Sequence, residues 1–424
     1  MKLSIENLFQ LLFPLLVCSL YLPPVFYTLF TSCLVILAGF ALSKGYNLNY
    51  KQPLPWLFAG FFVVHLNGLF INTDLTAVLN GVQNKLSFIL LPFILTVFQP
   101  LLTRSFFRKL IAAFFYSSVL ICVVFLILST INLFENYNQL AEHNRIEELR
   151  AFNHYYASFL THGYMHRSYF GLLIGAALFS SPFVAPIHSA KRFFFYLAIV
   201  LLLGVLFLLQ SRMILIAFVF CAFLYLVLKI IQSRSITWAI YLGLGILSLG
   251  VLAFFFKDSP YNRFNKVAVE DYELSGDSND FTGSTIRFAI WENSLELIKE
   301  HPVVGVGYGD LRKKRLEVYR ENGFKIGHSQ KFNSHNQLLE TQLVAGIPGT
   351  FFLLAMFGVV VWIAIKRKDT HLFILTTFIF LSMLTEAMFE RQLAITFWCT
   401  YILALAMGEK VAFKKEEPAF SKLS

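Results

Sequence analysis

The sequence predicts an all-α polytopic membrane protein with about twelve transmembrane helices, and three observations carry this prediction. Hydrophobic residues make up 57% of the 424 residues and charged residues only 14%, with a mean hydropathy of +0.64. Long apolar runs recur along nearly the whole chain, and basic residues are concentrated in alternate short connections between these runs. A soluble domain of ordinary proportions could not bury this much apolar surface, so lipid is the expected solvent.

The apolar runs have the length that a membrane-spanning helix needs. Crossing about 30 Å of hydrocarbon takes roughly 20 mostly apolar residues, and a helix satisfies its own backbone hydrogen bonds there. The expected spans are residues 8–22, 25–43, 54–70, 86–98, 108–131, 167–186, 193–210, 212–231, 236–256, 337–365, 371–388 and 391–408. The fourth span is short and the first ends at Pro23 and Pro24, so either could be tilted or re-entrant.

The net charge of +10 is explained by membrane topology, and no nucleic-acid partner is expected. Among the short connections, basic residues fall mainly in alternate ones and in the C-terminal tail, namely Lys44, Lys51, Arg104, Arg108, Lys109, Lys191, Arg192, Lys229, Arg234, Lys366, Arg367, Lys368, Lys410, Lys414 and Lys415. This positive-inside pattern predicts that both termini are cytoplasmic and that the bilayer is crossed an even number of times. It places the two long hydrophilic segments, 132–166 and 257–336, outside the cytoplasm.

The predicted organisation has four parts. Residues 1–256 hold about nine spans and the external loop 132–166, residues 257–336 form a large external loop between helices 9 and 10, residues 337–408 hold the last spans, and residues 409–424 form a cytoplasmic tail. The five cysteines all lie in apolar runs, where they are expected to be small hydrophobic residues. Binding and catalysis concentrate in long loops on a rigid scaffold, which directs attention to residues 257–336.

A helix is expected within that loop, with Ser284 or Thr285 as its N-cap and His301-Pro302 at its end. Its helical periodicity places Arg287 toward the buried side, where an uncompensated guanidinium is costly and an anion is favoured. The alternative is that the stem of Arg287 packs beside Trp291 while its charged head reaches water.

Three further motifs follow this helix. The glycine-rich run 302–310 has neither phosphate-loop spacing, so a tight turn is expected. The basic run 312–315 is expected to form a solvated face or to touch anionic lipid headgroups. His335 stands at the entrance of the tenth span, where it is either a cap or a catalytic group.

Polar residues at three span ends fall on the same external side as this loop. Arg212 begins the eighth span, His166 and Arg167 begin the sixth, and Lys85 opens the fourth. Each motif alone is typical of an anchor at the membrane interface. Together with Arg287 and His335 they could surround a polyanion at the lipid boundary, and Arg is suited to bidentate recognition of phosphate.

The order of these motifs resembles the O-antigen ligase and polymerase superfamily of membrane glycan transferases. The matching elements are Ser211-Arg212, Arg287 to Trp291, Pro302 to Gly307, His335 to Glu340, and Gly346 to Gly349. The motifs cover the second half of the chain, and the expected topology covers all of it. Members of the superfamily include ligases that move O-antigen to lipid A-core, polymerases that extend the glycan, and oligosaccharyltransferases that modify protein.

The resemblance implies a glycosyltransferase of cell-envelope polysaccharide and lipopolysaccharide synthesis, in the bacterial inner membrane with its active site facing the periplasm. The donor would be a glycan on undecaprenyl diphosphate, and the acceptor would be a hydroxyl of lipid A-core, of a growing polysaccharide or of a protein. The reaction would invert the anomeric centre and need no cofactor or metal. Consistent with this, the acidic stretch Asp277–Asp280 lacks an EF-hand pattern because Phe281 occupies its fifth position.

The resemblance also implies roles for particular residues. Arg212 and Arg287 match the family's arginines and would neutralise the departing diphosphate. His335 matches the family's histidine and would act as the general base, with its ring oriented by Asn336 or Gln337. The residues expected to contact substrate are Arg167, Lys85, His166, Glu340 and Trp291. His166 and Glu340 are the alternative bases.

An exporter or flippase of the same lipid-linked glycan is the alternative function. It would also need cations facing a polyanion, but along a pathway on both sides of the membrane. Glu340 and Glu386, two charged residues within expected spans, lie toward the external ends of these spans. This one-sided distribution favours the enzyme.

Overall fold

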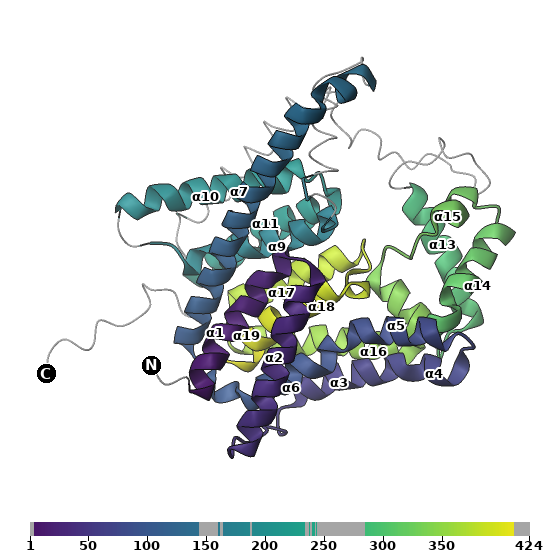
Figure 1. Ribbon diagram of the computed structural model, residues 1–424, viewed down its shortest axis with the longest axis horizontal. Helices are drawn as coiled ribbons and strands as arrows, with labels where there is room; N and C mark the ends of the chain where they lie inside the picture. Colours follow the sequence, from purple (N-terminus) through teal and green to yellow (C-terminus); the bar gives the residue numbers. More distant parts are fainter. Residues whose placement is uncertain are drawn as a thin grey trace, which may run out of the picture.

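The computed structural model describes residues 4–143, 160–161, 164–186, 189–233 and 285–410, with a few single positions between 237 and 243. In these parts of the chain the secondary structure is helical throughout (Figure 1). The predicted all-α class is confirmed for the described residues. Ser284 and the acidic stretch 277–280 lie outside them.

The first part of the chain forms long helices joined by short 3-10 turns. They are α1 (Ile5–Cys18), η1 (Ser19–Tyr21), α2 (Pro24–Ser43), α3 (Pro53–Val64), η2 (His65–Asn67), α4 (Gly68–Ile71), α5 (Leu75–Lys85), α6 (Ser87–Val97), η3 (Gln99–Leu101), α7 (Arg104–His143), α9 (Arg167–Ser180), η4 (Ser181–Phe183), α10 (Ser189–Leu208) and α11 (Arg212–Ser233). Pro24 and Pro53 begin α2 and α3, where a helix does not need the missing N–H group.

The remaining helices fall into two groups. The loop subdomain consists of α13 (Thr285–Glu300), α14 (Tyr308–Glu321) and α15 (Lys325–Gln330), and the helices that follow are α16 (Gln337–Lys366), α17 (Thr370–Met383), η6 (Met388–Glu390), α18 (Gln392–Phe397), the π-helical turn η7 (Trp398–Ile402) and α19 (Leu403–Met407). Figure 1 shows the loop subdomain in green at one end of the helix bundle, beside α4, α5 and α16.

The chain is a multi-pass membrane protein. Seven helical segments of the described residues are long and apolar enough to cross a bilayer, namely Pro24–Ser43, Pro53–Ile71, Leu75–Val97, Arg104–Glu135, Lys191–Leu208, Arg212–Ser233 and Gln337–Lys366. Shorter apolar helices occupy Ile5–Tyr21, Thr370–Met383 and Gln392–Met407. The expected ninth span, 236–256, lies almost wholly outside the described residues, so the count of about twelve stays a prediction.

The expected fourth span is longer than its predicted bounds of 86–98. Helices α5 and α6 are separated only by Leu86, and together they form an apolar unit of 23 residues, Leu75–Val97. The prediction was wrong because Asn80, Gln83 and Asn84 interrupt the apolar pattern of α5. Lys85 therefore lies within this unit and does not open it.

Aromatic side chains fill the centre of the bundle. Trp398 is fully buried, and its ring centroid lies 4.2 Å from that of Phe357 on α16 and 6.1 Å from that of Phe389 in η6. Phe389 also packs edge-on against Phe88 of α6, with 5.2 Å between the centroids. This packing fixes the chain segment between α17 and α18, which carries two carboxylates.

Helix α16 is broken at Gly346, whose φ of 60° and ψ of −155° are not helical. The glycine-rich run lies against this break. Val306 N–H donates to Leu343 O at 2.6 Å, Gly307 N–H donates to Val344 O at 3.0 Å, and Ile347 N–H donates to Val303 O at 3.1 Å. The run therefore uses the carbonyl groups that the break frees, and the predicted tight turn is confirmed.

Glycine is required at the break because the two backbones approach closely. A Cβ atom at position 346 would lie 2.1 Å from Val303 O, and the positive φ is itself strained for an L-residue. We expect Gly346→Ala to lower the melting temperature of the purified protein, since the strain alone costs about 1–3 kcal/mol and the clash adds to it. Gly358→Ala in the same helix meets nothing within 4 Å and serves as the control. Equal melting temperatures for the two variants would show that the break is not held by this contact.

Candidate active site

The segment between α17 and α18, Glu386 to Arg391, is held by three different helices, and we call it the carboxylate segment. The backbone N–H of Phe389 donates to Gln337 Oε1 of α16 at 2.6 Å. Lys85 donates to the carbonyl of the same Phe389, and Tyr169 OH of α9 donates to Ala387 O at 3.3 Å. The two carboxylates of the segment, Glu386 and Glu390, are thereby placed in fixed positions.

Glu386 contacts the histidine that the sequence singles out. His335 Nδ1 lies 3.3 Å from Glu386 Oε1, and the exposed fractions of the two side chains are 28% and 12%. The backbone of His335 is left-handed, with φ of 44°, and its N–H donates to Asn333 Oδ1 at 3.0 Å. The imidazole is therefore partly open on one side and faces a carboxylate on the other.

The expectation that Asn336 or Gln337 orients the imidazole is wrong. Asn336 is the N-cap of α16, and its Oδ1 accepts from Leu338 N–H at 2.9 Å. Gln337 is fully buried and binds Thr341 and the carboxylate segment. The Asn336 oxygen and both ends of the Gln337 amide are thus bonded to other groups, and Glu386 lies beside the ring.

Ionisable groups of two other elements also influence Glu386. Burial by itself would raise the pKa of Glu386, but His335, His166 and Arg287 together lower it below its usual range. The carboxylate is therefore ionised at neutral pH, and the stabilisation it gains is lost only as the pH falls through this lowered pKa. Burial lowers the pKa of the Arg287 guanidinium, while Glu386 opposes that effect.

Two helix starts adjoin this cluster. Ser168 Oγ and Ser211 Oγ are 3.3 Å apart, which joins the beginning of α9 to the beginning of α11. His166 is the N-cap of α9, and Arg167 and Arg212 are the first residues of the two helices. The positive ends of two helix dipoles and two guanidinium groups are thus gathered in one region, a setting that favours an anion.

Helix α13 reaches the same region as predicted. It ends at Glu300, directly before His301-Pro302. Its polar residues Glu292, Glu296 and Lys299 are exposed. Trp291 is half-buried, and its indole N–H donates to Ser334 O at 3.0 Å. Trp291 therefore fastens α13, and with it Arg287, to the turn that carries His335.

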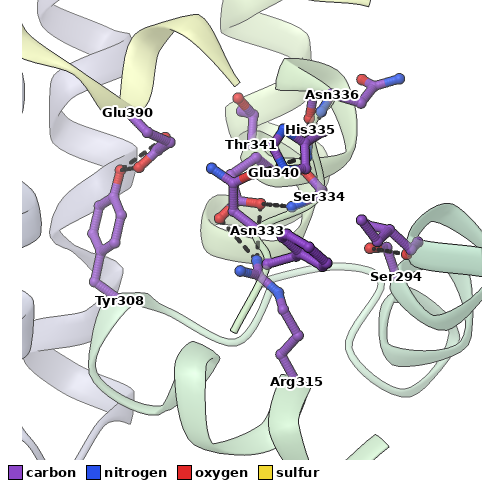
Figure 2. A network of polar contacts seen from close by, with 12 residues as sticks. Ser294, Tyr308, Arg315, Asn333, Ser334, His335, Asn336, Glu340, Thr341 and Glu390 are labelled. Atoms are coloured by element: carbon purple, nitrogen blue, oxygen red, sulfur yellow. Dashed lines mark hydrogen bonds and ion pairs between the residues drawn. The ribbon is translucent and has the colours of Figure 1, made fainter. Parts of the chain in front are cut away.

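A buried ion pair holds the turn that precedes α16. Arg315 Nη2 lies 2.8 Å from both carboxylate oxygens of Glu340, and Ser334 N–H donates to Glu340 Oε2 at 3.0 Å (Figure 2). Glu340 is thus fully engaged one turn into α16. The expected solvated face of the basic run is correct for Arg312 and Lys313, which are exposed, but wrong for Arg315.

Lys85 takes part in a second buried ion pair. Its Nζ lies 2.8 Å from Glu390 Oε1, and the lysine side chain is fully buried. Tyr308 OH donates to Glu390 Oε2 at 3.3 Å (Figure 2), and the Lys85 ammonium lies 5.8 Å from the centre of the Tyr308 ring. Burial raises the pKa of Tyr308 well above its usual value. Lys85 and Glu340, which were expected to contact substrate, are therefore each paired with a charged side chain of the protein.

Comparison with known proteins agrees with the motif order in the sequence. Residues 197–354 match the model of a protein family described as O-antigen ligase. The chain carries an O-antigen ligase domain. This domain includes α11, the loop subdomain and the first part of α16, and therefore Arg212, Arg287 and His335. His166, Arg167 and Glu386 reach the site from outside the matched residues.

A relative from Haemophilus influenzae, described as an uncharacterized protein, is 28% identical to this chain over 112 residues. The match covers 26% of this chain and 27% of the relative. The chain thus matches about a quarter of that protein's length.

No three His, Cys, Asp or Glu side chains are grouped so that they could hold a metal ion in the described part of the chain. Glu386 with His335 is the nearest approach to such a set among the contacts above, and His166 influences Glu386 only at longer range. Metal independence of the O-antigen ligase domain remains a prediction.

Two residues of the site were not among those expected from the sequence. Arg315 follows Leu311 by four residues and precedes Val318 by three, so the helical period already places it on the buried face of α14. Glu386 ends the apolar run of α17, and a carboxylate in such a run signals a functional or paired group. Neither pattern identifies the residue that pairs with Arg315 or with Glu386.

The Arg315–Glu340 pair generates a test of how the turn is held. Removing one partner of a buried ion pair typically costs about 3–5 kcal/mol, because the other charge stays buried without compensation. We expect Arg315→Met to lower the melting temperature, and Arg312→Met, in the exposed part of the same basic run, to leave it unchanged. Adding Glu340→Leu to Arg315→Met should recover part of the loss. A single variant that melts like the wild type would remove the pair from the account of this turn.

Proposed function

We propose that this protein is a glycan transferase that moves a glycan from an undecaprenyl-diphosphate carrier to an acceptor hydroxyl. The O-antigen ligase domain supports this class of activity. The observation that carries the proposal is the convergence of His335, Arg287 and His166 on Glu386, beside the cationic starts of α9 and α11. A base and an anion site are the two features that transfer from a lipid diphosphate requires.

Diphosphate leaves readily once its developing charge is neutralised. Arg287 and Arg212 provide planar guanidinium groups for this purpose, and Arg167 adds a third at the adjoining helix start. The dipoles of α9 and α11 favour the same negative charge. The described contacts place Lys85 in an ion pair with Glu390, so its proposed role is to position the carboxylate segment.

His335 is the proposed general base. The acceptor oxygen attacks the anomeric carbon, the bond from that carbon to the phosphate oxygen breaks, and the hydroxyl proton passes to the imidazole. A single displacement of this kind inverts the anomeric centre. Glu386, 3.3 Å from the ring, would orient it and stabilise the imidazolium that forms.

Glu340 and Trp291 act on the base indirectly in this proposal. Both bind Ser334, one through its N–H and the other through its carbonyl oxygen, and so fix the residue that precedes His335. The open side of the imidazole is left for the acceptor. The site is proposed to face the periplasm from the bacterial inner membrane, with both termini cytoplasmic, as the distribution of basic residues predicts.

The acceptor class can be assigned by comparing a deletion strain with the wild type. Loss of glycan from lipid A-core with accumulation of long lipid-linked glycan indicates a ligase, and loss of chain length indicates a polymerase. Loss of glycan from protein alone indicates an oligosaccharyltransferase. Unchanged lipopolysaccharide, polysaccharide and glycoprotein, with normal lipid-linked intermediates, would contradict the proposed function.

The arginines generate a prediction about the leaving group. We expect Arg287→Ala and Arg212→Ala each to lower the rate of transfer from an undecaprenyl-diphosphate donor by about 10²-fold or more, because a charge-stabilising donor is lost in the transition state. Lysine should restore little, since it supplies a point charge without the planar fork. Arg320→Ala, an exposed arginine on α14, is the matched control. Purified enzyme in detergent gives the rates, and wild-type turnover by either alanine variant would exclude that arginine.

The His335–Glu386 contact generates a prediction about pH. His335→Gln should lower kcat by about 10²–10⁴-fold at every pH. Glu386→Gln should lower kcat by about 10²-fold or more while the donor still binds. The difference in kcat between the wild type and Glu386→Gln should narrow as the pH falls through the lowered pKa of Glu386, because the wild-type carboxylate then also becomes neutral.

The control for this series is Glu300→Gln, which removes an exposed carboxylate at the end of α13. It should keep the wild-type rate and profile. A Glu386→Gln enzyme whose loss of kcat is the same at every pH would indicate that Glu386 only supports the fold. Full activity of His335→Gln would show that another group is the general base.

A further inference from the structure

We propose that the turn at Val303 and Val304 is inserted into the outer edge of the hydrocarbon on the side of the loop subdomain, where it contacts lipid chains. This inference does not depend on the proposed function, only on the chain being a membrane protein. It concerns a segment that the sequence pattern assigns to a hydrophilic external loop.

The first observation is the exposure of apolar side chains. Val303 and Val304 are 59% and 49% exposed, although the turn that holds them is tightly bonded through its backbone. Two neighbouring elements present apolar side chains as well. The whole set, which we call the turn patch, consists of Leu69, Phe70, Ile71, Val303, Val304 and Ile347.

Hydrogen bonds place the turn level with the end of one membrane span. Asn67 Nδ2 donates to Val304 O at 2.8 Å, and Asn72 Nδ2 donates to Val306 O at 2.7 Å. These asparagines flank α4, which closes the span Pro53–Ile71. Phe70, near that end, is 86% exposed. The turn therefore lies where this span meets the membrane boundary.

A second span independently places the turn at the same depth in the membrane. The N–H of Ile347 donates to Val303 O, directly beyond the break in α16. From residue 347 to Lys366 the helix is about 30 Å long, enough to cross the hydrocarbon without the part before the break. Ile347 and Phe351 are exposed on this helix, as expected for residues that face lipid. Val303 thus continues the lipid-facing surface of α16.

Both spans place the turn at the edge of the hydrocarbon, and we therefore infer that lipid chains contact the turn patch. Large exposed apolar side chains that continue the face of a membrane helix are stable in hydrocarbon and costly in water. Polar and charged groups begin shortly afterwards, since Arg312 and Lys313 of α14 are exposed. The order of apolar turn and basic helix is that of a segment resting on a bilayer surface.

The test is a depth measurement on spin labels attached to single cysteines. The five native cysteines are first replaced, and the variant must melt like the wild type. Val303→Cys and Val304→Cys are labelled in nanodiscs, with Phe351→Cys as the lipid-facing reference and Lys313→Cys as the water-facing reference. Neither valine substitution removes a hydrogen bond, because the turn is bonded through its backbone.

Collision rates with oxygen, which partitions into lipid, and with a water-soluble nickel chelate separate the outcomes. We expect the oxygen-to-nickel ratio at 303 and 304 to be close to that at 351 and well above that at 313. A ratio like that at 313 would overturn the proposal. Protection from both reagents, with spin–spin broadening between two copies, would also overturn it and would assign the patch to a protein contact.

Discussion

The structure depends on burying two carboxylates of the segment between α17 and α18. A buried carboxylate is costly unless a cation and hydrogen-bond donors meet it. Lys85 of α5 meets Glu390, while His335, His166 and Arg287 gather around Glu386 from three other parts of the chain. These partners come from segments up to about three hundred residues apart, so satisfying the carboxylates fixes the relative positions of the helices that form the candidate site.

The loop subdomain is held to the bundle by contacts of different kinds at its two ends. Near His335, charge and an indole hold the chain, through the Arg315–Glu340 pair and the bond from Trp291 to Ser334. At the glycine turn, backbone hydrogen bonds and Asn67 hold the subdomain, because Gly346 lets the turn and α16 approach within hydrogen-bonding distance. Side-chain networks of this kind specify one arrangement, and close backbone contacts keep it rigid.

Much of the fold followed from the sequence, because crossing a membrane constrains a helix by length and apolar content alone. The limits of α13 and the glycine turn were also predictable from local signals such as His301-Pro302 and the glycine spacing. The partners of buried charges were not. Asn336 or Gln337 was expected to orient His335, yet Asn336 caps α16, Gln337 binds the backbone of Phe389, and Glu386 lies beside the ring. Periodicity shows which face a residue occupies but not what lies opposite, since that depends on contacts between segments distant in sequence.

The break at Gly346 also resolves a mismatch of lengths between two neighbouring helices. As a continuous rod, α16 would extend about 45 Å, whereas α17, which follows it after a tight turn at residues 367–369, rises only about 21 Å before it ends. The two lengths differ by about 24 Å, yet His335, which precedes α16, lies beside Glu386, which follows α17. The break at Gly346 allows the first nine residues of α16 to take a different direction from the rest of the helix, and the imidazole before them contacts the carboxylate. The position of the histidine therefore depends on a backbone torsion that follows it in the chain as well as on the turn that precedes α16.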